Sequence, residues 1–220
     1  MIDFAEMRRA MVDAQVRAND VTDLRIVGAM METPRERFVP ASLRNFAYID
    51  DDLLVKEGRP SRYLMEPMVL AKLLQAADVG PQDLVLDVGA GTGYSTAILS
   101  RLAGQVVALE EDAELAAQGS AVIVDLGLLN AAFVHGPLTA GWSREAPYDV
   151  ILLNGSVDAV PPALLAQLKP GGRLVAVVGA GRAGRATVFS NTQGGIGSRI
   201  VFDAGVPLLP GFEAKPAFVF

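Results

Sequence analysis

The spacing of hydrophobic and polar positions predicts helices in the N-terminal part of the chain. Residues 5–18 place apolar side chains near one helical face, with the arginines largely on the other, as in an amphipathic helix. The stretch LRIVGAMME predicts a second helix that begins after Thr22 as its N-cap. It should end before Pro34, because the residue preceding a proline is disfavoured in helical conformation.

From residue 34 to residue 67 no hydrophobic period holds, and Pro, Arg, Asp and aromatic residues are frequent. We therefore predict a long irregular arm. Long structureless segments in compact proteins are more often functional than idle, so this arm is a candidate substrate region. The sequence divides into residues 1–67, with the N-terminal helices and the substrate arm, and residues 68–220, with a regular domain.

In residues 68–220, short apolar strands alternate with helices. The helical segments are MVLAKLLQAA, YSTAILSRLA, AELAAQGSAVIVDLG and PALLAQL, and the strands are LVLDV, QVVALE, AAFVH, DVILLN and RLVAVVG. This alternation predicts an α/β fold, a mostly parallel sheet with helices on both faces. The tail segments ATVFSN, SRIVFDA and KPAFVF are strand-like without an intervening helix, which predicts an antiparallel edge.

Composition narrows the functional classes. The chain of 220 residues has a formal net charge of -6, so nucleic acid and anionic membranes are not expected partners. It contains no cysteine and one histidine, His135, which argues against thiolate catalysis and against a His- or Cys-rich metal centre; we predict no metal site. The charged N-terminal stretch lacks a signal-peptide core and no apolar run is long enough to span a membrane, so a cytoplasmic protein is expected.

Two glycine-rich loops are candidate ligand sites. Gly179, Gly181 and Gly184 match the dinucleotide pattern G-x-G-x-x-G, and Asp203 follows at a distance suited to a ribose hydroxyl. A dinucleotide fold requires a helix next, and RATVFSNTQGGIGSR is not helical in character. We interpret this loop as a turn between edge strands.

The other loop follows strand LVLDV and precedes a helix. Gly89, Gly91 and Gly93 are spaced G-x-G-x-G, and Asp87 precedes them at a place where a pyrophosphate would meet negative charge. S-adenosylmethionine is cationic, so a carboxylate favours it. The glycines allow close approach of the backbone, and the helix that starts at Tyr94 and Ser95 can present its N-terminus to the methionine carboxylate.

A second acidic residue completes the expected cofactor site. Glu110 ends strand QVVALE, the neighbour of the first strand, where a carboxylate can accept hydrogen bonds from both ribose hydroxyls. The alternative is that Glu110 is an acid at a helix N-terminus, a role that Glu111 or Asp112 can also fill.

These residues belong to a wider resemblance. The chain resembles the protein-L-isoaspartate O-methyltransferase family of class I methyltransferases in MVDAQVRANDVTD, PRERFVP, AYIDDDL, EPMVLAKLL, VLDVGAGTGYSTAILS, APYDVILL and VPPALLAQLKPGGRLVAVVG. The resemblance implies a Rossmann-like seven-stranded sheet, with the order of the last two strands left open. It also implies S-adenosylmethionine as methyl donor and a protein or peptide substrate with an abnormal aspartyl carboxylate. Such a carboxylate is already ionised at neutral pH and requires no general base.

The chain departs from the family in two loops. Family members read GQTISQP where this chain reads GRPSRYLMEP, so Met65 and Glu66 replace a serine and a glutamine. Ser61, Arg62 and Tyr63, with Arg59, are the candidate catalytic residues that can replace the lost donors on the acceptor side. The alternative is that they are solvated loop positions. Because Met65 cannot donate a hydrogen bond and Glu66 would repel a carboxylate, activity on isoaspartyl peptides is predicted to be low or absent.

The second departure is at the adenine side, where Pro137 stands in place of an acidic residue and leaves the Leu138 backbone amide as the expected contact. Two functions remain open. One is a methyltransferase acting on isoaspartyl residues or a related carboxylate, and the other is a non-catalytic relative that binds S-adenosylmethionine.

Overall fold

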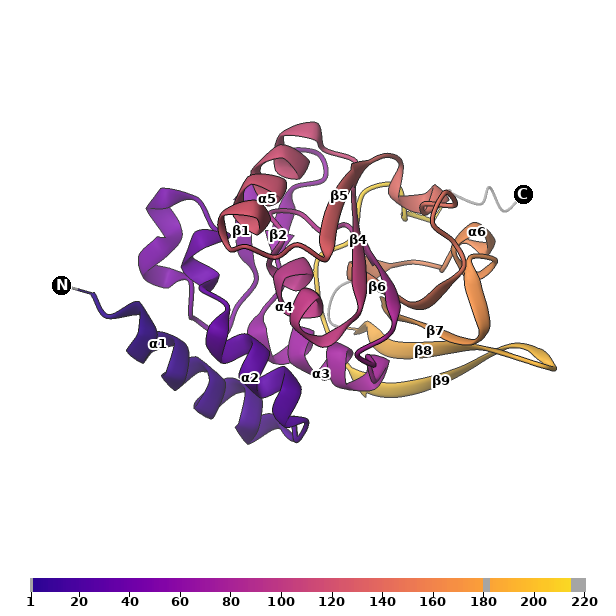
Figure 1. The fold of residues 1–220 in the computed structure, drawn as a ribbon, viewed down its shortest axis with the longest axis horizontal. Coiled ribbons are helices and arrows are strands. Elements are labelled where there is room, and N and C mark those ends of the chain that lie inside the picture. The colour runs from indigo at the N-terminus through magenta and orange to yellow at the C-terminus, as the bar shows by residue number, and fades with distance from the viewer. Residues whose placement is uncertain (1, 180–182, 215–220) are drawn as a thin grey trace.

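A seven-stranded sheet forms the centre of the computed structural model, which describes residues 2–179 and 183–214 (Figure 1). The strands lie in the order β5-β4-β3-β6-β7-β8-β9. Their bounds are β3 (Leu84–Val88), β4 (Gln105–Glu110), β5 (Ala131–His135), β6 (Tyr148–Val157), β7 (Leu168–Val178), β8 (Arg185–Thr192) and β9 (Gly195–Asp203). The first five are parallel, and β8 and β9 are antiparallel to their neighbours.

The predicted mostly parallel sheet with an antiparallel edge is thus confirmed, and the last two strands lie in chain order. The strand β8 begins at Arg185 and pairs antiparallel with β7, so the described residues from Arg185 onward form an edge strand where a dinucleotide fold has a long helix. The third predicted tail strand, residues 215–220, and Gly181 lie outside the described residues.

Helices cover both faces of the sheet, as predicted, but unequally. The helices α3 (Pro67–Ala77), α4 (Tyr94–Leu102) and α5 (Ala113–Asp125) contribute to an apolar cluster on one face, together with the N-terminal helices. A smaller cluster on the other face includes Leu164 of α6 (Pro162–Leu165) and Leu138 of a 3-10 turn, Leu138–Ala140. In Figure 1 the N-terminal helices lie to the left of the sheet and α6 lies to its right. The prediction of a helix over PALLAQL is wrong for the residues after Leu165, because α6 ends there and the chain turns tightly into β7.

The predicted helix over residues 5–18 is divided. An α-helix, α1 (Phe4–Met11), continues as a π-helical turn, Val12–Val16, and a 3-10 turn, Arg17–Asn19. Both Val12 and Val16 are buried, so the wider turn keeps these two side chains, four positions apart, in the apolar cluster.

The second helix, α2 (Leu24–Glu32), ends before Pro34 as predicted, but the predicted N-cap is wrong. The carboxylate of Asp23 accepts a hydrogen bond from the Arg25 N–H and caps the helix. The backbone N–H of Thr22 instead donates to the Gln75 side chain of α3, so the residue ties two helices together.

The arm is more ordered than the absence of a period indicated. It contains 3-10 turns at Arg35–Arg37 and Ala41–Phe46, and then an antiparallel hairpin of β1 (Leu53–Lys56) and β2 (Arg62–Leu64). Buried residues of the N-terminal segment and of the sheet share one apolar cluster, and the division at residue 67 stays a prediction.

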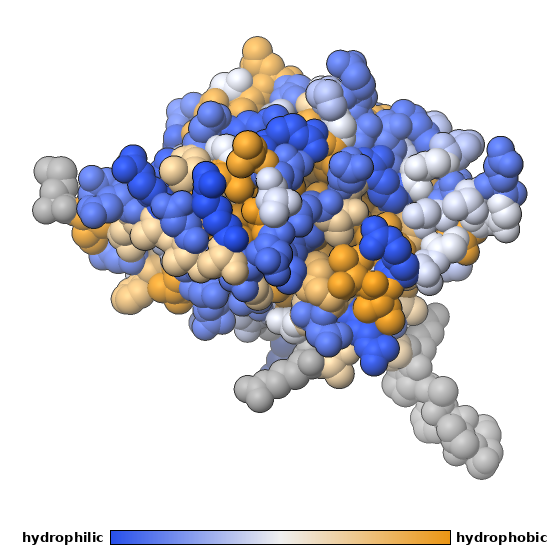
Figure 2. Space-filling model, turned by 90° about the horizontal axis from the view of Figure 1, so that it is seen from below, coloured by the Kyte–Doolittle hydropathy of each residue, from blue (hydrophilic) through white to orange (hydrophobic). Residues whose placement is uncertain are grey.

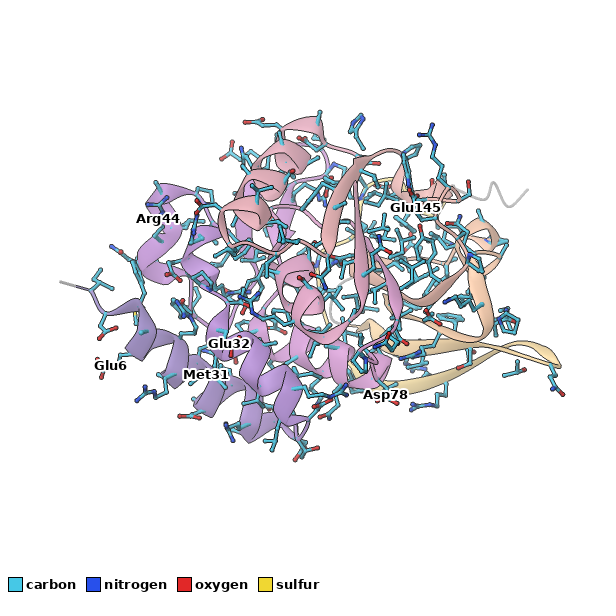
Figure 3. All side chains as sticks on the ribbon, in the orientation of Figure 1. Glu6, Met31, Glu32, Arg44, Asp78 and Glu145 are labelled. Carbon is cyan, nitrogen blue, oxygen red and sulfur yellow. The ribbon has the colours of Figure 1, made fainter. Side chains whose placement is uncertain are left out.

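The outer surface is mixed in character. The face seen from below combines polar with scattered apolar residues (Figure 2). The charged side chains labelled in Figure 3, including Glu6, Arg44 and Glu145, are exposed, whereas the acids Asp87 and Glu110 are buried. Within residues 2–179 and 183–214, every helix is too short or too polar to cross a lipid bilayer.

Candidate active site

The loop between β3 and α4 forms an open backbone cradle. Gly89, Gly91 and Gly93 have φ values of +74°, +57° and +96°, which residues with a side chain rarely adopt. A Cβ placed on Gly91 would meet only the Gly89 carbonyl oxygen, at 3.9 Å, so space is open in front of this residue. The loop can therefore approach a ligand closely at Gly91.

Glu110 lies beside this loop, at the end of the neighbouring parallel strand. The pairing of Val88 with Leu109 brings the carboxyl ends of β3 and β4 together, and Glu110 is fully buried there. Its Oε2 accepts a hydrogen bond from the Gly91 N–H at 2.7 Å, and its Oε1 accepts from the Glu111 and Asp112 N–H groups at 3.0 Å.

The alternative role for Glu110, as the acid at a helix N-terminus, belongs to Asp112. The Asp112 carboxylate is the N-cap of α5 and accepts hydrogen bonds from the Glu114 and Leu115 N–H groups.

Asp87 is also fully buried, but it faces protein groups. Its carboxylate accepts hydrogen bonds from the Ser95 and Thr96 hydroxyls, at 2.8 and 2.6 Å, and from the Asn154 side-chain amide. Burial raises the pKa of Asp87 to about 6, and these three donors oppose that rise. Asp87 thus links β3 to α4 and β6 beneath the glycine loop. The roles of Thr96 and Asn154 were not predicted from the sequence, and no local pattern marks the contact between Asp87 and Asn154, which lie 67 positions apart.

Arg62 is the unexpected member of the site. Its guanidinium forms a bidentate ion pair with Glu110, with Nη1–Oε1 2.5 Å and Nη2–Oε2 2.8 Å, and Nη2 lies 3.3 Å from the Gly89 carbonyl oxygen. Only 7% of Arg62 is exposed. The structure places Arg62 against the predicted cofactor residues, whereas the sequence suggested the acceptor side.

The two neighbours of Arg62 lie differently. The Ser61 hydroxyl is within hydrogen-bond distance of the Gly58 carbonyl, at 3.2 Å, inside the turn of the arm. Tyr63 is 38% exposed and lines two narrow cavities with Met65 and Asn154. The three residues line one narrow cavity together, but the polar groups of Ser61 and Arg62 are bonded to Gly58 and Glu110.

The space around the site is divided into a wide pocket and two narrow cavities. The wide pocket has a volume of about 510 Å³ and lies between the arm, residues 56–60 and 62, and residues 111–112, 135–137 and 210. The narrow cavities, about 10 Å³ each, are lined by the glycine loop, residues 63–65, Asn154 and residues 206–209. Arg62 lines both the wide pocket and one narrow cavity, so it stands between them.

The side chains of Tyr94 and Leu138 are buried in the protein interior and do not face the pocket. The Tyr94 ring is fully buried against Phe38, at a centroid distance of 5.5 Å, and beneath the guanidinium of Arg35 at 4.7 Å. Leu138 is buried in the smaller apolar cluster. A ligand contact by either residue is therefore limited to the backbone, which at Tyr94 is the first residue of α4.

The predicted acceptor side contains two carboxyl groups with raised pKa values. Burial, with Asp52 nearby, raises the pKa of Glu66 to about 7, and burial raises the pKa of Asp52 to about 6. The Asp52 carboxylate accepts a hydrogen bond from the Glu66 N–H at 2.9 Å, directly before α3. Met65 is buried, and its carbonyl accepts from the Arg35 guanidinium at 2.9 Å. Glu66 is thus only partly ionised at neutral pH. Among the described residues, no group of three or more His, Asp or Glu side chains is arranged to hold a metal ion.

The chain is similar to a well-defined group of enzymes. The family model described as "Protein-L-isoaspartate(D-aspartate) O-methyltransferase (PCMT)" matches residues 6–203. A protein-L-isoaspartate O-methyltransferase of Koribacter versatilis is 42% identical over 176 residues, which are 80% of this chain and 78% of the relative. The corresponding protein of Methylorubrum extorquens is 41% identical over 177 residues, 80% of this chain and 76% of the relative.

Solved structures agree with this result. A protein-L-isoaspartate O-methyltransferase structure superposes with a TM-score of 0.80 at 26% identity, covering 93% of this chain and 66% of that one. A putative protein-L-isoaspartate O-methyltransferase from Plasmodium falciparum, in complex with S-adenosyl-L-homocysteine, has a TM-score of 0.77 at 18% identity and covers 92% of this chain and 97% of that one. The second likeness supports the fold alone.

Proposed function

Because the chain belongs to the protein-L-isoaspartate(D-aspartate) O-methyltransferase family, we propose that it transfers a methyl group from S-adenosylmethionine to the abnormal carboxylate of isoaspartyl residues in proteins. The observation that carries this proposal is the pairing of the glycine cradle with Glu110 at the carboxyl ends of adjacent parallel strands. Open α/β sheets bind their ligands at this edge.

The residues fit the cofactor in their chemistry. Space is open at Gly91, Glu110 is an acceptor suited to a ribose diol, and a pocket of about 510 Å³ adjoins both. Ligand sites of this kind have volumes of about 300–1,000 Å³. The narrow cavity at the glycine loop is much smaller, and the Arg62 guanidinium lies against Glu110 at the edge of the wide pocket.

In this proposal each residue has a distinct task. Gly89, Gly91 and Gly93 allow the backbone close to the ligand, and the N-terminus of α4 at Tyr94 and Ser95 faces its carboxylate. Asp87 holds Ser95 in place through their hydrogen bond, Glu110 accepts from the ribose hydroxyls, and the backbone of Leu138 bounds the adenine side. The bound cofactor supplies an electrophilic methyl group.

The residues on the acceptor side have to orient the isoaspartyl carboxylate, and they do not have to remove a proton from it. An isoaspartyl carboxylate is an anion at neutral pH, so no residue has to remove a proton from it. Ser61, Arg62 and Tyr63 are the donors that we assign to it, because they lie on the arm strand or directly before it and line one narrow cavity together. Holding the acceptor and the methyl group in line provides the main rate acceleration.

The test is methyl-ester formation on an isoaspartyl peptide and on the same peptide with normal aspartate, together with calorimetry of S-adenosylmethionine binding. Gly91→Val should abolish binding, because it fills the space in front of the loop. Gly127→Val is the matched control, since Gly127 also has a positive φ, +68°, and lies outside the site with nothing within 4 Å of a Cβ. Absence of cofactor binding by the wild type, or equal methylation of both peptides, would contradict the proposal.

A further inference from the structure

We propose that Arg62 is an internal competitor of the cofactor: it holds Glu110 in the ligand-free protein, and the arm must release it before S-adenosylmethionine binds. This inference rests on the proposed function and concerns how the same site is controlled. The bidentate pair between Arg62 and Glu110 is the observation from which it starts.

The acceptor capacity of Glu110 is already used. Its two oxygens receive two hydrogen bonds from Arg62 and three from backbone N–H groups of the loop and of the start of α5. A carboxylate has about four lone-pair positions, so five donors leave none for ribose hydroxyls. The backbone donors belong to the fold, whereas Arg62 comes from a hairpin 48 residues earlier in the chain. Arg62 is therefore the donor that the ligand displaces.

Arg62 also controls the available space. The wide pocket reaches Arg62, Glu111 and the turn at residues 135–137, and one narrow cavity is lined by the glycine loop. The Arg62 guanidinium lies at the edge of the wide pocket and 3.3 Å from the Gly89 carbonyl oxygen. A cofactor that extends from the adenine side to the glycine loop has to pass through the position of the guanidinium. Withdrawal of the guanidinium is therefore expected to open the wide pocket towards Gly89.

The arm is anchored at its base and held at its tip by ion pairs. At the base, Arg35 donates to the carbonyls of Ala47 and Met65, at 2.7 and 2.9 Å. Towards the tip, the Lys56 ammonium lies 2.8 Å from carboxylate oxygens of both Asp112 and Glu114 at the start of α5. The buried base bonds are expensive to break, whereas water can replace the exposed Lys56 pairs at little cost. We therefore expect the tip of the β1–β2 hairpin to move away from α5, while the bonds of Arg35 keep the base of the hairpin in place.

Cofactor affinity then depends on the fraction of molecules in which Arg62 is released. If Arg62 is paired with Glu110 in nine-tenths or more of the molecules, the apparent dissociation constant for S-adenosylmethionine is raised at least tenfold. Arg62→Met keeps much of the side-chain length without the charge. We expect this variant to bind S-adenosylmethionine at least tenfold more tightly than the wild type.

Calorimetry with S-adenosylmethionine tests this on the wild type, Arg62→Met and a control, Arg25→Met. Arg25 forms a surface ion pair with Asp23 through two of its nitrogens, so the control removes similar chemistry far from the site. Unchanged affinity in the control and tighter binding by Arg62→Met support the proposal. Equal or weaker binding by Arg62→Met overturns it and leaves the proposed function standing, whereas absence of binding by all three proteins overturns both.

Binding kinetics of the wild type give a second test that does not require a variant to fold. Trp142 is the only tryptophan and packs against Gly136, which lines the wide pocket, so its fluorescence reports ligand arrival. Release of Arg62 before binding predicts that the observed rate levels off when S-adenosylmethionine is in excess but keeps rising when the protein is in excess. The same saturating rate under both conditions shows that the slow step follows binding, and overturns the proposal.

Discussion

At the scale of single residues, two helical glycines have opposite surroundings. A Cβ on Gly28, within α2, would have no atom within 4 Å. A Cβ on Gly119, within α5, would lie 2.3 Å from Cζ of Phe133, because the helix packs against β5 at this point. The absence of a side chain at Gly119 is therefore required by packing, whereas at Gly28 it is not.

We predict that Gly28→Ala raises the free energy of unfolding by about 0.5–1 kcal/mol, since alanine loses less backbone entropy on folding. Gly119→Ala should lower it by about 1–3 kcal/mol through overpacking against Phe133. Urea denaturation of both variants and the wild type measures these changes. Equal stabilities of the two variants would show that α5 adjusts its distance from the sheet.

At the scale of elements, the junction between the hairpin and α3 decides how the acceptor side is lined. Met65 is buried beside the narrow cavity that contains Gly89 and Gly91, and Glu66 directly precedes α3. Burial, with Asp52 nearby, raises the pKa of Glu66 to about 7, so the charge of Glu66 changes around neutral pH. Repulsion of an anionic acceptor is therefore partial, and it increases with pH.

We expect the double substitution Met65→Ser, Glu66→Gln to increase methyl transfer to an isoaspartyl peptide on the order of tenfold. The serine supplies a donor to the acceptor carboxylate and the glutamine removes the negative charge, and a hydrogen bond to a charged group is worth about 1.5–3 kcal/mol. Steady-state rates at pH 7 measure the effect.

The chain offers a matched control in Met31 and Glu32, the same dipeptide on α2, both labelled in Figure 3. Met31→Ser, Glu32→Gln should leave the rate unchanged. A similar increase in both double variants would show that the effect is not local to the acceptor side.

At the scale of the whole molecule, buried carboxyl groups set the pH dependence of stability. Burial raises the pKa of Asp52 and Asp87 to about 6 and that of Glu66 to about 7. Between the unfolded values near 4 and these folded values, the folded protein binds more protons than the unfolded chain. Its stability must then decrease as pH rises through this range.

We predict that the free energy of unfolding is largest near pH 4 and falls towards pH 8. It should also fall below about pH 4, because hydrogen bonds from Arg25 and Lys56 lower the pKa values of Asp23 and Asp112, and protonation removes these interactions. Urea denaturation from pH 3.5 to pH 8 measures the profile. Glu66→Gln should reduce the slope above pH 6, and a stability that rises from pH 5 to pH 8 would contradict the prediction.

The sequence by itself determined the features that depend on local pattern. The alternation of apolar strands and helices was enough for the sheet, since each element must bury one face. The glycine spacing and the position of Glu110 at a strand end placed both at one edge of the sheet, because parallel strands share the direction of their carboxyl ends.

Only the tertiary structure decided how distant side chains pair. Arg62 with Glu110, 48 positions apart, and Asp87 with Asn154, 67 positions apart, carry no local signal in the sequence. The π-helical turn after Met11 and the hairpin of the arm likewise follow from packing against the shared core. Local patterns specify which face of an element is buried, but the partner of a buried charge is chosen where separate segments meet and no water remains to solvate it.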